Sequence, residues 1–135
     1  MSFLPKNPIF VVQRHQASHL HYDFRIEKDA VLKSWAIPKE PPRVPGIKRL
    51  AIQVADHELS YAQFEGTIPE GSYGAGTVTI WDSGTYLPIA DSPGELVIDL
   101  EGKRLKGVYC LIKMKPKKSE DANWLFFKKS HVSKR

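Results

Sequence analysis

Residues 20–27 of the chain read Leu-His-Tyr-Asp-Phe-Arg-Ile-Glu, and apolar and polar residues alternate along this stretch without a break. Successive side chains of a β-strand point to opposite faces, so one face of this segment is apolar and the other carries imidazole, carboxylate and guanidinium groups. The period of two therefore predicts a strand that buries one face and presents the other for chemistry.

Strand signals of the same kind recur along the rest of the chain. β-Branched and aromatic residues favour eight further strands, at 9–12, 33–36, 49–54, 64–67, 76–82, 95–100, 107–114 and 124–128. Turn residues separate them, among them Asp82-Ser83-Gly84 and Ser92-Pro93-Gly94, and short helical turns fit only at 58–63 and 88–92. This pattern predicts an all-β, mainly antiparallel fold, a compact barrel or sandwich with short helical segments.

Length and composition limit the class of protein. A chain of 135 residues fits one domain, 1–135, with a short N-terminal arm at 1–8 and a basic C-terminal tail at 130–135. The 20 Lys and Arg against 15 Asp and Glu give a charge of +5, which permits a polyanionic partner without requiring one. The lone Cys110 lies in an apolar run and is expected to be a buried thiol. Neither a membrane span nor a secretion signal is evident, so the cytoplasm is expected.

The polar face of residues 20–27 suggests a metal site. His15 precedes His21 by six residues with the same parity, so it can join His21 and Asp23 around one cation. Two imidazoles and a carboxylate leave coordination positions open for water and substrate, and they suit manganese, iron or zinc. Arg25 is then placed to clamp a phosphate or carboxylate with two hydrogen bonds. The alternative is an ordinary solvent-facing strand, and His19 is expected to be an exposed neighbour.

Two further segments carry candidate residues. Asp56-His57-Glu58 follows a predicted strand, where His57 can protonate a leaving oxygen or stabilise negative charge, and Tyr61 can donate to a phosphate oxygen. The alternative for this cluster is a polar turn. The glycines between 66 and 76 match neither standard phosphate-loop pattern and predict a turn. Lys39 and Arg49 can add positive charge beside a phosphate, or they are solvated surface residues.

The chain resembles the 3′-phosphoesterase module of bacterial ATP-dependent DNA ligase D. Four runs carry the resemblance: Phe-Val-Val-Gln-Arg-His at 10–15, Leu-His-Tyr-Asp-Phe-Arg at 20–25, Leu-Lys-Ser-Trp-Ala-Ile-Pro-Lys at 32–39, and Phe-Glu-Gly-Thr-Ile-Pro-Glu-Gly-Ser-Tyr-Gly-Ala-Gly at 64–76. The resemblance covers about residues 10–129 and implies a stand-alone β-barrel with a metal-binding groove. It further implies removal of a 3′-terminal ribonucleoside and of a 3′-phosphate in end-joining repair.

The resemblance also implies roles for individual residues. His15, His21 and Asp23 match metal ligands, with manganese preferred and zinc or cobalt as substitutes. The phosphate contacts and other active-site positions match Arg25, His57, Tyr61, Gln13, Lys39 and Arg49. The chain departs from the family at Ala55, where an acidic residue is usual, and at the short N-terminal arm, which lacks the family's Arg, Asp and Glu. Both departures bear on ribonucleoside removal more than on phosphate removal.

Partners and rival functions follow from the same reading. The expected partners are DNA or RNA 3′ ends, a DNA ligase, a primer-type polymerase and a Ku-like end-binding protein, with no membrane. Two alternatives come from other classes: a catalytically inactive nucleic-acid-binding barrel that acts as an adaptor, and a non-haem iron enzyme, since two His and one Asp also describe that centre. Two observations separate the phosphoesterase, the adaptor and the iron enzyme: which metal copurifies with the protein, and whether phosphate blocks the metal site.

Overall fold

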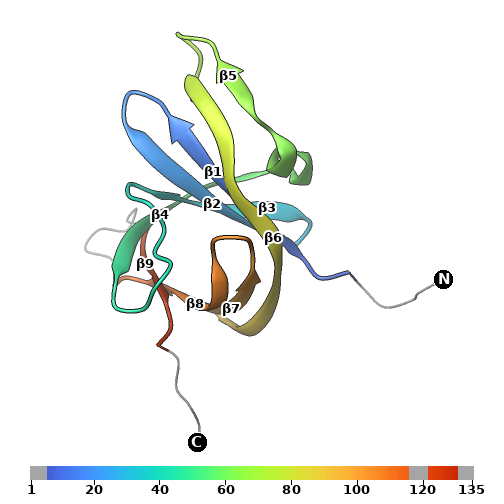
Figure 1. Ribbon diagram of the computed structural model, residues 1–135, viewed down its shortest axis with the longest axis vertical. Helices are drawn as coiled ribbons and strands as arrows, with labels where there is room; N and C mark the ends of the chain where they lie inside the picture. The colour runs from blue at the N-terminus through green and yellow to red at the C-terminus, as the bar shows by residue number, and fades with distance from the viewer. Residues whose placement is uncertain (1–5, 116–121, 131–135) are drawn as a thin grey trace, which may run out of the picture.

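A computed structural model of the chain describes residues 6–115 and 122–130 (Figure 1). Within these ranges the chain forms nine strands and one short 3₁₀ helix. The strands are β1 (Ile9–Gln16), β2 (Leu20–Lys28), β3 (Val31–Ile37), β4 (Lys48–His57), β5 (Gly66–Ile68), β6 (Gly76–Ser92), β7 (Glu95–Glu101), β8 (Lys106–Lys113) and β9 (Asn123–Lys128). The 3₁₀ helix is η1 (Leu59–Gln63).

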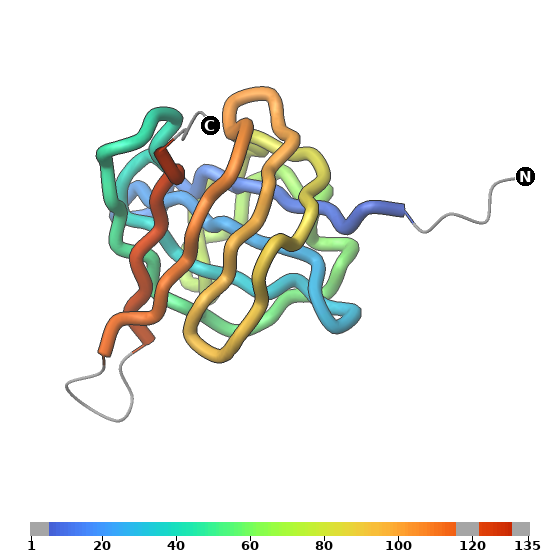
Figure 2. The backbone as a smooth tube through the Cα atoms, turned by 90° about the horizontal axis from the view of Figure 1, so that it is seen from below, coloured from blue at the N-terminus to red at the C-terminus, as the bar shows by residue number. Residues whose placement is uncertain are grey.

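Eight of the strands close into an antiparallel barrel. The order is β1-β2-β3-β4-β9-β8-β7-β6, and a second pairing joins β6 back to β1. Figure 2 shows β9, β8 and β7 side by side along one wall. The remaining strand, β5, pairs with the start of β6, and this β5–β6 hairpin projects from the barrel (Figure 1). The predicted all-β barrel is confirmed.

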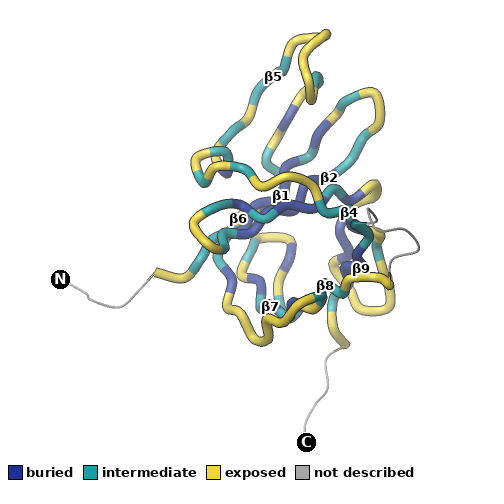
Figure 3. The backbone as a smooth tube through the Cα atoms, turned by 180° about the vertical axis from the view of Figure 1, so that it is seen from behind, coloured by how far each residue is buried: buried dark blue, intermediate teal, exposed yellow. Residues whose placement is uncertain are grey.

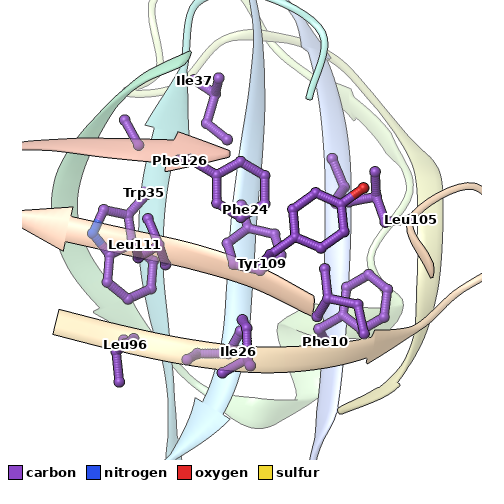
Figure 4. Packing of buried hydrophobic residues seen from close by; sticks show 14 of the residues in the cluster. Phe10, Phe24, Ile26, Trp35, Ile37, Leu96, Leu105, Tyr109, Leu111 and Phe126 are labelled. Atoms are coloured by element: carbon purple, nitrogen blue, oxygen red, sulfur yellow. The ribbon is translucent and has the colours of Figure 1, made fainter. Parts of the chain in front are cut away.

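The barrel interior holds one large hydrophobic core. On β2 the buried side chains Tyr22, Phe24 and Ile26 point inward, as the alternation predicts. Phe24 packs against the Phe126 ring with centroids 4.8 Å apart, and Phe126 stacks on Tyr109 (Figure 4). Burial of each such side chain contributes roughly 1.5–3 kcal/mol. The inward faces of the strands therefore hold the barrel together and free the outward faces for other roles.

The long strand β6 corrects two predictions. Turn residues at 82–84 do not end the strand, and 88–92 is extended and not helical. The buried Asp82 carboxylate accepts hydrogen bonds from the backbone N–H groups of Ser83, Lys103, Arg104 and Leu105. Gly84 passes so close to the Glu101 carbonyl that a Cβ there would clash. The turn-type residues thus serve a bend and a close approach inside one continuous strand.

Other boundaries differ less. β1 continues to Gln16 and β4 to His57, so His57 is the last residue of its strand and does not lie in a separate turn. The predicted helical turn at 58–63 is confirmed as η1. Cys110 is buried, as expected. Most of the predicted arm and tail, residues 1–5 and 131–135, lies outside the described residues.

The outer face of β1 and β3 is also covered in part. A small second cluster forms there from Val11, Leu32 and Ala62, so η1 packs against the outside of the barrel. Figure 3 shows buried backbone at β1 and β2 and an exposed tip on the β5–β6 hairpin. Among the described residues no helix is long and apolar enough to span a bilayer.

Candidate metal centre

His15, His21 and Asp23 come together on the outer face of the β1–β2 hairpin. In the register of this hairpin His15 lies opposite His21, and Gln13 lies opposite Asp23. One ligand atom from each of the three side chains lies within 4.8 Å of the other two. Asp23 Oδ2 is 3.4 Å from His21 Nε2 and 4.0 Å from His15 Nδ1. Their side chains are 10%, 27% and 11% exposed in chain order, so the cluster is sheltered but reachable through His21.

Backbone carbonyls fix the orientation of both imidazoles. His15 Nε2 donates to the carbonyl of Ala75 at 3.2 Å, and His21 Nδ1 donates to the carbonyl of His19 at 3.3 Å. In each ring the nitrogen that faces Asp23 is therefore the one whose lone pair is available to a cation. A hydrogen bond from the second ring nitrogen to a carbonyl is the usual support of a metal-bound histidine.

This donor set fits a divalent cation. Ligand atoms about 2.1 Å from one ion lie roughly 3–3.5 Å apart, and the 3.4 Å between Asp23 Oδ2 and His21 Nε2 falls in this range. His15 Nδ1, at 4.0 Å from the same oxygen, would have to move closer to bind the same ion. A hydrogen bond to Asp23 raises the pKa of His21, opposed by partial burial, so a proton occupies this position at low pH. A cation would displace that proton, and its binding should weaken as pH falls.

Arg25 lies next to the three candidate ligands and is almost completely buried. Its Nε donates to Gln13 Oε1 at 2.6 Å, and its Nη1 donates to Ser34 Oγ at 2.9 Å and contacts His57 Nδ1 at 3.1 Å. Its Nη2 lies 3.3 Å from Asp23 Oδ2. Burial lowers the pKa of Arg25 from its ordinary value, and the negative charge of Asp23 opposes this change. The guanidinium therefore presents its Nη2 edge toward the metal centre.

A layer of polar and aromatic groups holds Arg25 from behind. Gln13, which is fully buried, donates through Nε2 to the carbonyls of Tyr61 at 2.7 Å and Phe64 at 3.3 Å. The Tyr61 ring lies under the guanidinium at 5.0 Å and stacks on Phe64. These contacts tie η1 to the hairpin, which explains why η1 covers this part of the outer face.

His57 completes the row of polar side chains. His57 Nδ1 lies 3.1 Å from Arg25 Nη1 and 3.2 Å from the Ala55 carbonyl. A guanidinium only donates hydrogen bonds, so the Arg25 contact needs the lone pair on Nδ1, whereas the Ala55 contact needs the proton there. Burial lowers the pKa of His57, and the positive charge of Arg25 lowers it further. Its neighbour Asp56 points elsewhere and pairs with Lys33 at 3.0 Å. In the tautomer that accepts from Arg25, the proton of the neutral ring lies on Nε2, where it can serve as a donor.

The remaining predicted residues lie apart from this row. Lys39 and Arg49 line one hollow of about 270 Å³, and Arg49 Nε donates to the carbonyl of Glu40. Neither side chain contacts His15, His21 or Asp23 among the described interactions. The exposed His19 takes part through its backbone carbonyl. Ala55, where an acidic residue was expected from the resemblance, brings its carbonyl to 3.2 Å from His57 Nδ1.

Two supporting residues were not singled out from the sequence. Ser34 is fully buried on β3 and links Arg25 to the carbonyl of Leu32. Ala75 takes part through its backbone oxygen alone. A serine inside an apolar strand is a signal that can be read, because a buried hydroxyl needs a partner. A backbone carbonyl leaves no signal in the sequence.

Comparison with known proteins identifies close relatives of the chain. A model of the family described as DNA Ligase D 3′-phosphoesterase domain matches residues 13–113. Multifunctional non-homologous end joining protein LigD of Pseudomonas aeruginosa is 52% identical over 109 residues, or 77% of the chain. LigD of Mycobacterium tuberculosis is 53% identical over 108 residues, again 77%, and LigD of Mycolicibacterium smegmatis is 44% identical over 130 residues, or 88%. The aligned regions make up only 13%, 14% and 16% of these three relatives.

Proposed function

Because the chain belongs to the family of DNA ligase D 3′-phosphoesterase domains, we propose that it is a metal-dependent phosphoesterase that processes 3′ ends of DNA or RNA-tipped DNA. The biological setting that we propose is non-homologous end joining, the process for which the relatives are named. The observation that carries the proposal is the convergence of His15, His21 and Asp23 beside a buried arginine.

The three converging side chains would hold the metal. We propose manganese as the physiological ion, bound by His15 Nδ1, His21 Nε2 and Asp23 Oδ2. When bound, such a cation polarises a phosphoryl oxygen and lowers the pKa of a coordinated water. The protein's own contribution is to hold the two imidazoles in the required orientation and to shelter the carboxylate from bulk solvent.

The neighbouring side chains would bind the phosphate. Arg25 uses Nε and Nη1 within the protein, so we propose that it approaches a phosphate oxygen through Nη2 alone and not as a two-pronged clamp. The Nε2–H of His57 would donate to a second oxygen and stabilise the charge that develops there. The Tyr61 ring, which lies under the guanidinium, would help to hold Arg25 in place. Loss of one donor of this kind typically lowers the rate on the order of 10²–10³-fold.

The substrate strand would continue over the basic hollow. Lys39 and Arg49 share this hollow with Lys48, and they would bind backbone phosphates behind the 3′ end. Activity should then decrease with rising salt. We propose 3′-phosphate removal as the main reaction and ribonucleoside removal as a lesser one, because Ala55 brings no carboxylate to His57. A ligase, a polymerase and a Ku-like protein are the proposed partners.

The test is an assay with manganese and two 5′-labelled primers, one ending in a 3′-phosphate and one in a single ribonucleotide. Wild-type protein should process the first end, while His21→Ala and Asp23→Ala should be inactive and still folded. His19→Ala is a matched control, since its side chain is exposed and outside the cluster of three ligands, and its carbonyl remains. Failure to process either end with any divalent metal would refute the enzyme; binding without turnover would indicate an adaptor. If iron copurifies with the protein and phosphate does not bind at the metal, the protein would be an iron enzyme.

A further inference from the structure

Tyr73, at the tip of the β5–β6 hairpin, is unusually exposed. Its relative accessibility is 105%, so the ring packs against nothing in the protein. The other large hydrophobic residues that are exposed in the described part of the chain are aliphatic, such as Leu87 at 48% and Ile89 at 57%. An aromatic ring held fully in water contributes nothing to the core and is available to a ligand.

The loop that carries Tyr73 is fixed to the metal centre. Two residues after Tyr73, the Ala75 carbonyl accepts the hydrogen bond from His15 Nε2. Two residues span at most about 7 Å, so the backbone at Tyr73 lies within about 7 Å of the residue that orients a candidate ligand. Figure 1 shows the β5–β6 hairpin rising beside the β1–β2 hairpin, from which all three candidate ligands come.

The conformation of this loop is well defined. Successive backbone hydrogen bonds run from Ser72 N to Pro69 O and from Ala75 N to Ser72 O, each 3.2 Å long. Gly76 has a φ of +133° and lies against the end of β1, where a Cβ would clash with the Gln16 carbonyl. The loop is therefore seated on the strand that carries His15, and it presents Tyr73 in a defined place beside the centre.

We propose that the Tyr73 ring is a stacking platform for a nucleobase at the 3′ end of the substrate strand. This inference rests on the proposed function, because the metal centre would hold the terminal phosphate and the attached nucleotide must extend away from it. Aromatic side chains bind bases of any sequence, since every base has a π-face. Lys39 and Arg49 provide charge for phosphates but no surface for a base, whereas Tyr73 provides a ring and no charge.

Stacking makes a specific prediction about substitutions. Tyr73→Ala should raise KM for a 3′-phosphate primer about 5- to 100-fold with little change in kcat, the range expected for loss of one base–aromatic stack. Tyr73→Phe and Tyr73→Trp should behave like wild type, because both retain a ring. Leu87→Ala is the control for removal of an exposed hydrophobic residue on the same strand system, and its kinetics should be unchanged.

An abasic substrate separates stacking from a structural role. We would replace the terminal nucleotide with an abasic 3′-phosphate. On this substrate the KM of wild type should rise to the value that Tyr73→Ala shows on the normal primer. The KM of Tyr73→Ala should be the same on both substrates. As a second readout, wild type should quench a 3′-terminal 2-aminopurine in the product strand, and Tyr73→Ala should not.

Equal KM values for wild type and Tyr73→Ala would overturn the inference. So would a deficit in Tyr73→Ala that persists undiminished on the abasic end, because the tyrosine would then act on the protein and not on the base. Failure of the proposed function has a different signature, namely a wild-type protein that turns over neither primer.

Discussion

Substitution of Ser34 by alanine is the most direct test of how Arg25 is held. Ser34 Oγ accepts from Arg25 Nη1 at 2.9 Å and donates to the Leu32 carbonyl at 3.0 Å, in a fully buried position. Alanine removes both bonds without adding an atom. A hydrogen bond to a charged group contributes about 1.5–3 kcal/mol and a neutral one about 1 kcal/mol. We therefore expect Ser34→Ala to lower the free energy of unfolding by about 2.5–4 kcal/mol.

The same change should reduce turnover. Gln13 and His57 still contact the guanidinium in the variant, so we expect kcat to fall on the order of tenfold, less than the 10²–10³-fold expected for removal of the arginine. Urea unfolding and steady-state kinetics on a 3′-phosphate primer measure the two effects, with Ser60→Ala, at an exposed site in η1, as control. Unchanged stability would refute the hydrogen-bond network, and unchanged turnover would refute its role in orienting Arg25.

Three further predictions test the site and the barrel. Manganese at 100 times its Kd should raise the free energy of unfolding by about 2.7 kcal/mol, seen as a higher Tm, and His21→Ala should abolish this rise. Asp82→Ala should cost about 3 kcal/mol or more in urea unfolding, because four backbone N–H groups lose their acceptor. Burial raises the pKa of Tyr86 from 10.0 to about 12, so the neutral phenol is favoured in the fold. Wild type should thus lose stability between pH 10 and 12 more steeply than Tyr86→Phe.

The fold was predictable where sequence periodicity reports burial directly. Along β2 the alternation predicted both the inward core residues and the outward polar row, because a strand has only two faces. The prediction failed at Asp82, since a turn-type residue gives the same local signal whether its carboxylate caps its own turn or a distant segment. Here it binds N–H groups at 103–105, and β6 continues through it. Such a partner is set by tertiary structure and leaves no local trace.

The candidate ligands were predictable for a similar reason. His21 and Asp23 share a face at a spacing of two, and a tight hairpin places His15 opposite His21, where cross-strand side chains are neighbours. The support of the site was not predictable in the same way. Ser34 comes from a third strand and Ala75 from a loop sixty residues from His15, so only the closed barrel brings them to the centre.

Barrel closure also determines when the centre can assemble. Every candidate ligand is encoded within the first 23 residues, yet β1 is flanked on its second side by β6, whose paired residues run from Thr77 to Thr85. A nascent chain that ends before residue 75 would carry all three ligands on a hairpin with an open edge and without the Ala75 carbonyl that contacts His15. Loop-closure entropy makes such distant pairings late events in folding. The chain should therefore become able to bind metal in the same step in which β6 pairs with β1 and closes the barrel. A partly folded chain should bind its cation poorly.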